Sequence, residues 1–146
     1  DREGFSNVQI VDTPDSAPEA ARIAAELARS GRLDALMKGS LHTDELMSAV
    51  VRKEAGLRTG RRISHMFVFD LPRYHKSLAL ADCVVNISPD LRTKTDILSN
   101  AIDLLGSLGL ANPKVGIVAA VETVNPSIPA TVDAQALVAR HREGAW

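Results

Sequence analysis

Short apolar runs alternate along this chain with longer stretches in which apolar residues recur at helical spacing, and this alternation restricts the fold most. The runs predict strands over 7–12, 33–39, 61–71, 76–87 and 113–122. The longer stretches predict helices over 13–31, 43–56, 88–109 and 131–141. The two central strands follow one another across a short turn, which predicts an antiparallel pair. The order indicates an α/β fold with a mixed, mainly parallel sheet flanked by helices.

Capping residues predict where these helices begin and end. Thr43 and Ser88 are the expected N-caps, with Pro89 at the first helical position of its helix. Gly31 and Gly56 follow the ends of the first two helices, where a left-handed residue is common.

Composition excludes several classes of function. The 146 residues suffice for one ordinary domain. A formal net charge of −1 and 3% aromatic residues argue against a surface for nucleic acid or an anionic membrane, and no run is apolar over a membrane-spanning length. The single cysteine, Cys83, cannot form an internal disulfide, and its apolar surroundings predict a buried, inert thiol. We therefore expect a cytoplasmic protein.

The stretch "KGSLHT" follows the second predicted strand, where ligands bind in open α/β sheets. Gly39 would let the backbone turn, and the N-terminus of the next helix favours anions. Further donors come from Lys38, Ser40, His42 and Thr43. Acidic residues in the first turn of that helix would oppose an anion. From these residues alone, an anion-binding loop and a plain strand–helix connector both remain open.

Two further stretches are candidates for binding. A basic cluster around "GLRTGRR" could contact phosphate groups or could be a solvated surface; it comprises Arg52, Lys53, Arg58, Arg61 and Arg62. "VETVNPS" places Glu122, Thr123 and Asn125 at a predicted strand end, where they could bind a ligand or cap the loop. The four histidines lack the spacing of metal ligands, so no metal site is expected.

Four blocks together resemble the phosphate acetyltransferase/butyryltransferase family: "LMKGSLHT", "GLRTGRRISHMFVFDLP", "ADCVVNISPDLRTKTDILSNAIDL" and "PKVGIVAAVETVNPSIPATVDA". The similarity extends to the phosphotransacylase domain of bifunctional proteins that also carry an enoyl-CoA hydratase domain. It implies an isocitrate/isopropylmalate dehydrogenase-like fold, a homodimer, and the reaction of acyl-CoA with inorganic phosphate to give acyl phosphate and CoA. CoA and phosphate are substrates of this reaction, and no cofactor is implied.

The resemblance also implies roles for individual residues. Ser40 and His42 become the expected catalytic residues. The expected phosphate- and CoA-binding residues are Lys38, Gly39, Thr43, Arg58, Arg61, Arg62, Ser64, Asn86, Thr123 and Asn125. Acyl-chain preference stays open between acetyl and butyryl.

The sequence departs from the family pattern in two places. Where better-known members have an arginine in an "LRPA"-like block, this chain has "LMSA", with Met47 or Ser48 at that position. The serine–arginine block that the family carries near its C-terminus has no counterpart before Trp146. Residues 1–146 are therefore expected to form part of a transferase domain and to have little activity alone. The alternatives are a non-catalytic α/β binding or interface module and, less favoured, a dehydrogenase of related fold.

Overall fold

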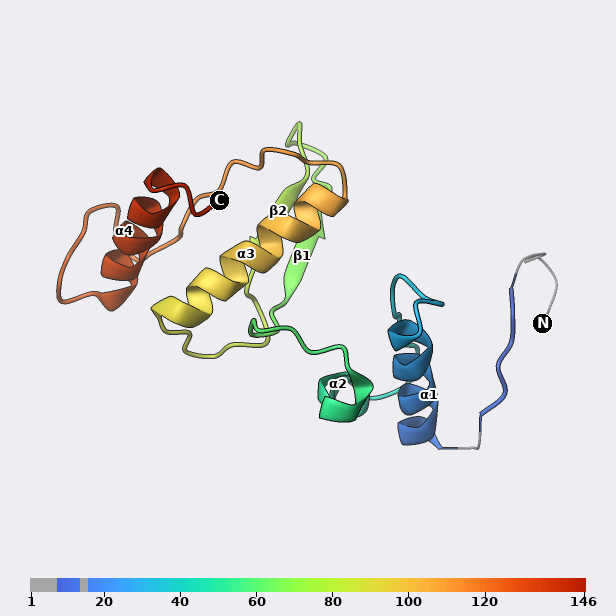
Figure 1. Cartoon of the computed structure of the whole chain (residues 1–146). Coiled ribbons are helices and arrows are strands. Elements are labelled where there is room, and N and C mark those ends of the chain that lie inside the picture. The colour runs from blue at the N-terminus through green and yellow to red at the C-terminus, as the bar shows by residue number, and fades with distance from the viewer. Residues whose placement is uncertain (1–7, 14–15) are drawn as a thin grey trace. The chain divides into compact units, whose positions relative to one another are not determined.

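The computed structural model describes residues 8–13 and 16–146 of the chain and combines helices with one small sheet. The chain divides into two compact units, residues 1–60 and residues 61–146. Unit 1 holds α1 (Ala17–Arg29), α2 (Thr43–Val51) and the short 3-10 helix η1 (Lys53–Ala55). Unit 2 holds β1 (Met66–Phe69), β2 (Leu78–Ala81), α3 (Leu91–Ser107) and α4 (Pro129–Arg142) (Figure 1). The predicted combination of helices and strands is confirmed.

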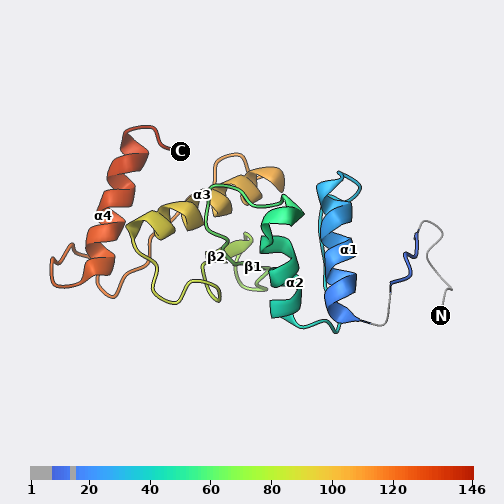
Figure 2. The same cartoon turned by 60° about the horizontal axis from the view of Figure 1, so that its bottom comes forward.

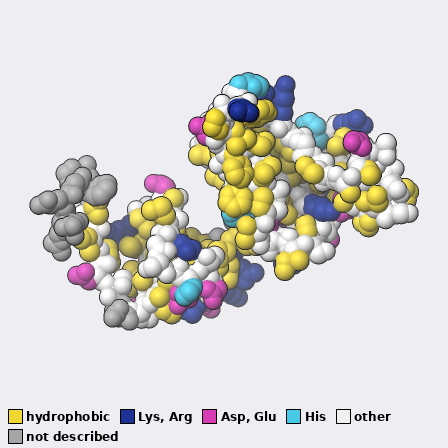
Figure 3. Space-filling model, turned by 180° about the vertical axis from the view of Figure 1, so that it is seen from behind, with side chains coloured by type: hydrophobic (Ala, Val, Ile, Leu, Met, Phe, Trp, Pro, Cys, Tyr) yellow, Lys and Arg dark blue, Asp and Glu magenta, His cyan; other side chains and the backbone are white. Residues whose placement is uncertain are grey.

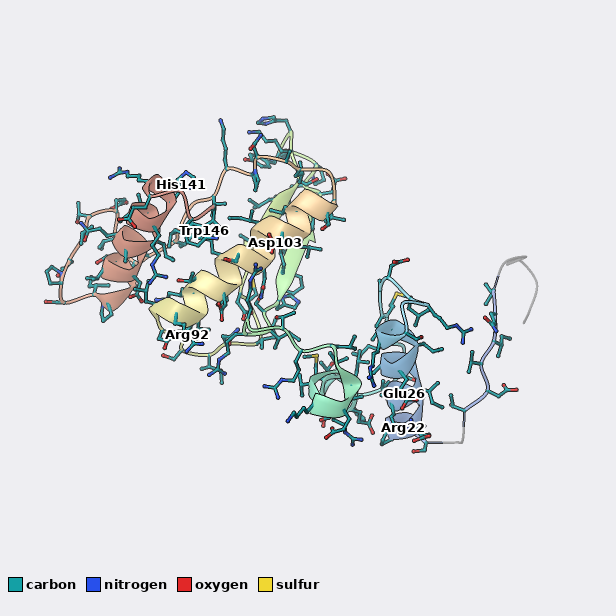
Figure 4. The ribbon with its side chains drawn as sticks, in the orientation of Figure 1. Arg22, Glu26, Arg92, Asp103, His141 and Trp146 are labelled. Atoms are coloured by element: carbon teal, nitrogen blue, oxygen red, sulfur yellow. The ribbon has the colours of Figure 1, made fainter. Side chains whose placement is uncertain are left out.

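In unit 1, α1 and α2 lie side by side in both ribbon views (Figures 1 and 2). Their contact is built from small side chains, which let two helices approach closely. The buried residues are Ala21, Ala25, Ala49 and Ala55, and Leu41, Leu46 and Leu57 pack against them. On the α1 surface, Arg22 forms ion pairs with Glu19 and Glu26 at helical spacing (Figure 4). The apolar stripe read from the sequence, comprising Ala20, Ile23, Ala24, Leu27 and Ala28, is only half-buried, so the helical spacing is confirmed but the buried positions are Ala21 and Ala25.

The helix ends in unit 1 follow the glycine signals. Gly31 has φ +72° just after α1, and Gly56 has φ +64° just after η1, both in the left-handed region that glycine favours. The predicted stop at Gly31 is confirmed, whereas α2 ends at Val51, before the predicted stop, and Gly56 follows η1 instead. The predicted N-cap of α2 is wrong by one residue, because His42 caps the helix and Thr43 is its first residue.

In unit 2, β1 and β2 pair antiparallel, from Met66 opposite Ala81 to Phe69 opposite Leu78. The predicted antiparallel pair is confirmed. Its register places Phe67, Phe69, Leu78 and Leu80 on one face. Three of these four side chains are exposed, and hydrophobic side chains gather visibly on this unit in the space-filling view (Figure 3).

Helix α3 carries the contacts that hold unit 2 together. Its N-cap is Asp90, which accepts a hydrogen bond of 2.7 Å from the Thr93 N–H, so the helix begins later than the predicted Ser88 cap. Ile97 of α3 and Leu137 of α4 are buried. Three polar contacts join α4 and the C-terminus to α3: Lys94 Nζ to Asp133 at 2.6 Å, Arg140 to Thr95 Oγ1 at 2.7 Å, and Trp146 Nε1 to Ser99 Oγ at 2.8 Å.

The mainly parallel sheet is not seen in the part of the chain that the structure describes, where β1–β2 is the one sheet. The predicted strands over 33–39 and 113–122, and the described part of 7–12, have no paired-strand structure. Many of their apolar side chains are exposed, with Met37 97% and Val118 90% exposed. An apolar run becomes a strand only where a second strand takes up its N–H and C=O groups. Among residues 8–13 and 16–146, no such strand pairs with these runs.

The turn after β2 is organised by the Asp82 carboxylate. It accepts hydrogen bonds of 3.0 Å from the backbone N–H groups of Val84, Val85 and Asn86. Partial burial raises the pKa of Asp82, but these hydrogen bonds and the one from the Asn86 side chain outweigh it and lower the pKa to about 2. Cys83 lies at this turn and is exposed, so the prediction of a buried thiol is wrong. The apolar run continues in sequence, but the strand ends at Ala81 and the turn brings the thiol to the surface.

We predict that the exposed Cys83 thiol reacts in the native chain. One equivalent of a chromogenic thiol reagent should be consumed without denaturant, because Cys83 is the sole cysteine and its side chain is accessible. The Cys83→Ser variant gives the zero level. Reaction that begins only after addition of denaturant would show that the thiol is buried.

We also predict that Asp82 makes unit 2 sensitive to acid. A carboxyl group whose pKa is lower in the folded state stabilises the fold above its unfolded pKa of about 3.9, and this contribution disappears as the pH falls towards 2. Asp82→Asn should therefore lower the free energy of unfolding at neutral pH by about 1 kcal/mol, allowing for partial exposure. Between pH 4 and 2, the free energy of unfolding of this variant should fall less than that of the original protein. Urea unfolding across this pH range measures both effects. Asp34→Asn, in an exposed loop of unit 1, is the control, and an unchanged pH dependence in Asp82→Asn would contradict the prediction.

Candidate functional site

The loop 38–42, which leads into α2, keeps its polar side chains at the surface. Lys38, Gly39, Ser40 and His42 are all exposed, and the Lys38 ammonium donates to the Leu41 carbonyl oxygen at 3.0 Å. Gly39 does not have a left-handed φ, and a Cβ built on it would meet nothing within 4 Å. The turn itself therefore does not require glycine, contrary to the sequence interpretation. The open space at Gly39 leaves room for a group approaching from outside.

The N-terminus of α2 is already partly used by an acidic side chain. The backbone N–H of His42 donates to Glu45 Oε2 at 3.0 Å, and Asp44 also lies in the first turn. These carboxylates compete with an external anion, as the sequence indicated. The side chains of Ser40, His42 and Thr43, rather than the whole set of helix N–H groups, are the donors that this loop presents to a ligand.

The predicted basic cluster is divided between the two units. Arg58 belongs to unit 1, where it is exposed and has no ion-pair partner among the described residues. Arg61 and Arg62 belong to unit 2 together with the predicted site residues Ser64 and Asn86. Within unit 2 these four predicted residues are brought together, because the segment 61–64 is held against α3 and the turn after β2.

Three side chains of α3 bind the segment 61–64. Asp103 Oδ2 accepts from the Arg61 guanidinium at 2.5 Å, and Asp96 Oδ2 accepts from the Arg62 N–H at 2.9 Å. The Asn100 side-chain amide donates to the Arg62 carbonyl oxygen at 2.8 Å and to Ser64 Oγ at 3.0 Å. One face of α3 thus fixes both the backbone and the side chains of the segment.

A second support comes from the turn after β2. The Asn86 side-chain amide donates to the Ile63 carbonyl oxygen at 3.0 Å and to Asp82 Oδ2 at 2.5 Å. Asn86 therefore acts in this structure as a link between the Asp82 turn and the segment 61–64.

The residues that hold this segment were missed by the sequence interpretation. Asp96, Asn100 and Asp103 follow one another at intervals of four and three residues, which places them on one face of a helix. This polar stripe was visible in the predicted helix over 88–109. What it binds was not visible, because the partners lie more than thirty residues away in the chain.

The third predicted site stretch forms a capped loop before α4. The Asn125 N–H donates to Thr131 Oγ1 at 2.9 Å, and Asn125 Oδ1 accepts from the Ser127 N–H at 2.9 Å. Thr131 is buried and donates back to the carbonyl oxygens of Asn125 and Ile128. These contacts match the loop-capping interpretation of Asn125. Thr123 lies exposed in the same loop.

Unit 2 also contains a cavity of about 330 Å³ between α3, the segment 111–117 and α4. Its lining is mainly apolar and includes His141 of α4 and the C-terminal residue Trp146 (Figure 4). None of the predicted site residues lines it. An anionic substrate needs cations and polar donors, so we do not place the substrate site in this cavity.

Two kinds of site are not found among the described residues. They contain no group of three or more His, Cys, Asp or Glu side chains arranged to hold a metal ion. Within residues 8–13 and 16–146, no helix has both the length and the apolar character needed to cross a membrane.

Comparison with known proteins matches nearly the whole chain to one family. The family model described as phosphate acetyl/butaryl transferase matches residues 6–145. The phosphate acetyltransferase of Rhizobium meliloti is 54% identical over 129 residues, which are 88% of this chain and 40% of that protein. The phosphate butyryltransferase of Clostridium acetobutylicum is 39% identical over 132 residues, 90% of this chain and 44% of that protein.

Among solved structures, a branched-chain phosphotransacylase from Enterococcus faecalis V583 is similar to this chain, with a TM-score of 0.77 and 30% sequence identity. The similarity covers 91% of this chain and 51% of that protein. The chain thus spans less than half the length of these two curated relatives and about half of the solved structure. Because the family model covers nearly all of its residues, the chain belongs to the phosphate acetyl/butyryltransferase family.

Proposed function

We propose that the protein containing this chain transfers an acetyl or butyryl group between CoA and inorganic phosphate. The observation that carries the proposal is the 54% identity to a phosphate acetyltransferase over 129 residues of this chain. Four relatives named phosphate acetyltransferase are 48–54% identical, whereas those named phosphate butyryltransferase are 39% and 38% identical and a further phosphate acetyltransferase is 36% identical; the four most similar of these favour acetyl as the group transferred. The relatives' names give no support to a non-catalytic module.

The chemistry of the proposed reaction fits a site of cations and hydrogen-bond donors. A phosphate oxygen attacks the thioester carbon, the carbon–sulfur bond breaks, and the CoA thiolate leaves and takes up a proton. Phosphate and CoA are both anions, so cationic side chains must offset their repulsion while holding them together. Negative charge develops on the thioester oxygen and needs donors that are already in place. We propose no cofactor for this reaction.

In this scheme the loop 38–42 supplies the reacting groups. Ser40 is proposed to donate to the thioester oxygen, and His42 to exchange the proton of the CoA sulfur. Their exposure at the surface of unit 1 supports the proposal, since neither side chain is packed into a core. Gly39 would allow close approach of the substrate, because the turn does not otherwise need a glycine.

The remaining family features are proposals as well. We propose an isocitrate/isopropylmalate dehydrogenase-like fold for the whole protein, in which the runs 7–12, 33–39 and 113–122 join a mainly parallel sheet. The exposure of Met37 and Val118 supports this, because such side chains gain from burial beneath a neighbouring element. A homodimer and a cytoplasmic location follow the family resemblance, with residues 1–146 as part of one transferase domain.

We predict that the protein produced from its complete reading frame converts acetyl-CoA and phosphate into acetyl phosphate. Release of CoA can be followed with a thiol reagent in a Cys83→Ser background, which removes the signal of the exposed thiol. Residues 1–146 assayed alone should release far less CoA. Absence of CoA release from the complete protein with both acetyl-CoA and butyryl-CoA would refute the proposed function.

We predict that Ser40→Ala and His42→Ala each lower turnover of the complete protein by about 10²–10³, the usual effect of losing a positioned donor. Gly39→Ala should leave the melting temperature unchanged, because its Cβ meets nothing in the fold, but should raise the KM of a substrate that approaches there. Ser30→Ala, which removes an exposed hydroxyl elsewhere in unit 1, is the control. If Ser40→Ala and His42→Ala both keep turnover within about threefold of the original, the loop only connects two elements and has no catalytic role.

A further inference from the structure

We propose that Arg62, and not its neighbour Arg61, provides the guanidinium that binds the phosphate group, and that Asp96 and Asn100 of α3 position it. This inference rests on the proposed function, because it assigns a substrate to one of two adjacent arginines. Helix α3 engages the two arginines differently, and all of these contacts lie within unit 2.

Arg61 is used by the fold through its side chain. Its guanidinium contacts Asp103 Oδ2 at 2.5 Å and Asn100 Oδ1 at 3.5 Å. Both contacts use Nη1 of Arg61, and the Asp103 carboxylate offsets the charge of the guanidinium, so a phosphate group would have to compete with Asp103 for Arg61. Arg61 therefore fastens the segment to α3.

Helix α3 contacts Arg62 through the arginine's main chain. Its N–H donates to Asp96 at 2.9 Å, and its carbonyl oxygen accepts from Asn100 at 2.8 Å. Both backbone hydrogen-bonding groups are thus fixed to one helix, while the exposed side chain forms no direct ion pair among the described residues. A cation presented from a fixed backbone loses less conformational freedom when it binds a ligand.

The two arginines are also directed towards different parts of α3. The charge of Arg62 acts on Asp90, the N-cap of the helix, whose pKa is lowered chiefly by hydrogen bonds from Thr93 and further by Arg62 and Arg92. Asp103 is thirteen residues further along, roughly 20 Å at the helical rise, and Figure 4 shows Arg92 in the first turn with Asp103 well beyond it. The charge of Arg62 thus acts near the N-terminal end of α3, where Asp90 already accepts from the Thr93 N–H, and far from Asp103, which binds Arg61.

Ser64 offers a second donor beside Arg62. Its hydroxyl oxygen accepts from the Asn100 amide at 3.0 Å, so the hydroxyl hydrogen is directed away from that bond and can donate to a ligand. The same Asn100 amide binds the Arg62 carbonyl oxygen. Asn100 thus fixes the positions of Arg62 and Ser64 relative to each other, which makes it a positioning residue.

The test compares matched variants of the protein made from its complete reading frame. The variants are Arg62→Ala, Arg62→Lys, Arg61→Ala and Asn100→Ala. For each variant we would measure kcat, the KM of phosphate and the melting temperature. Calorimetry would give the Kd of inorganic phosphate. Arg62→Ala should raise the KM and the Kd of phosphate by about tenfold or more, as expected for loss of a charged hydrogen-bonding group, without changing the melting temperature. Arg62→Lys should recover part of this loss, because it restores the charge without the guanidinium fork.

The other two variants separate anchoring from binding. Arg61→Ala should lower the melting temperature and leave the Kd of phosphate within about threefold, well below the loss expected for a ligand-binding charge. Asn100→Ala should raise the KM of phosphate more than it lowers kcat, since substrate contacts away from the reacting carbon would be disturbed.

Particular results would overturn the assignment. A larger rise in phosphate Kd for Arg61→Ala than for Arg62→Ala would reverse the two roles, and an unchanged Kd in Arg62→Ala would exclude Arg62. If the unmodified protein binds phosphate without turning over acyl-CoA, the proposed function fails while the calorimetric comparison still decides between the arginines. If it binds no phosphate, the assignment fails as well.

Discussion

The set of hydrogen bonds between α3 and the segment 61–64 is the interaction on which the candidate site of unit 2 depends. Asp96, Asn100 and Asp103 lie on one face of the helix and bind a segment more than thirty residues earlier in the chain. Asn86 binds the same segment from the other side and is itself held by Asp82. These contacts hold a basic stretch that follows Gly60 against the helix. The helix therefore serves as the scaffold for residues that the sequence had marked only as a cluster of charge.

The charges of this nearly neutral chain bear on how it would bind the anionic substrates proposed for it. Several predicted anion-binding groups have an internal partner: Lys38 binds a carbonyl oxygen, the His42 N–H binds Glu45, and Arg61 binds Asp103. Such partners keep cationic loops ordered before a substrate arrives, at the cost of competing with it. Among the predicted binding residues, Arg58 and Arg62 have no direct ion-pair partner that the described residues supply, so a phosphate group could bind either without breaking an ion pair.

Much of the local structure could be predicted. The helical spacing of apolar residues between 20 and 28, the glycine at 31, and the apolar runs on either side of the turn at 72–75 indicated the first helix and the antiparallel pair that are observed. The family could be identified from four separated blocks. The candidate site was predicted as a set of residue types, but their arrangement was not, because Ser64 and Asn86 owe their positions to Asn100 and Asp82 through contacts that span the chain or a turn.

By itself, the sequence determined the helical periodicity, the end of the first helix at Gly31, the cluster of cationic residues and the family, since each depends on residues close together or on a pattern of identities. The tertiary structure decided which apolar runs are paired strands, that Cys83 is exposed, and which arginine is engaged by α3. The physical reason is the same in all three cases. A strand needs the backbone of another segment, burial needs a covering element, and an ion pair needs an opposite charge within reach. Each of these partners is distant in the chain, or outside the run itself, and only folding brings it into contact or leaves it apart.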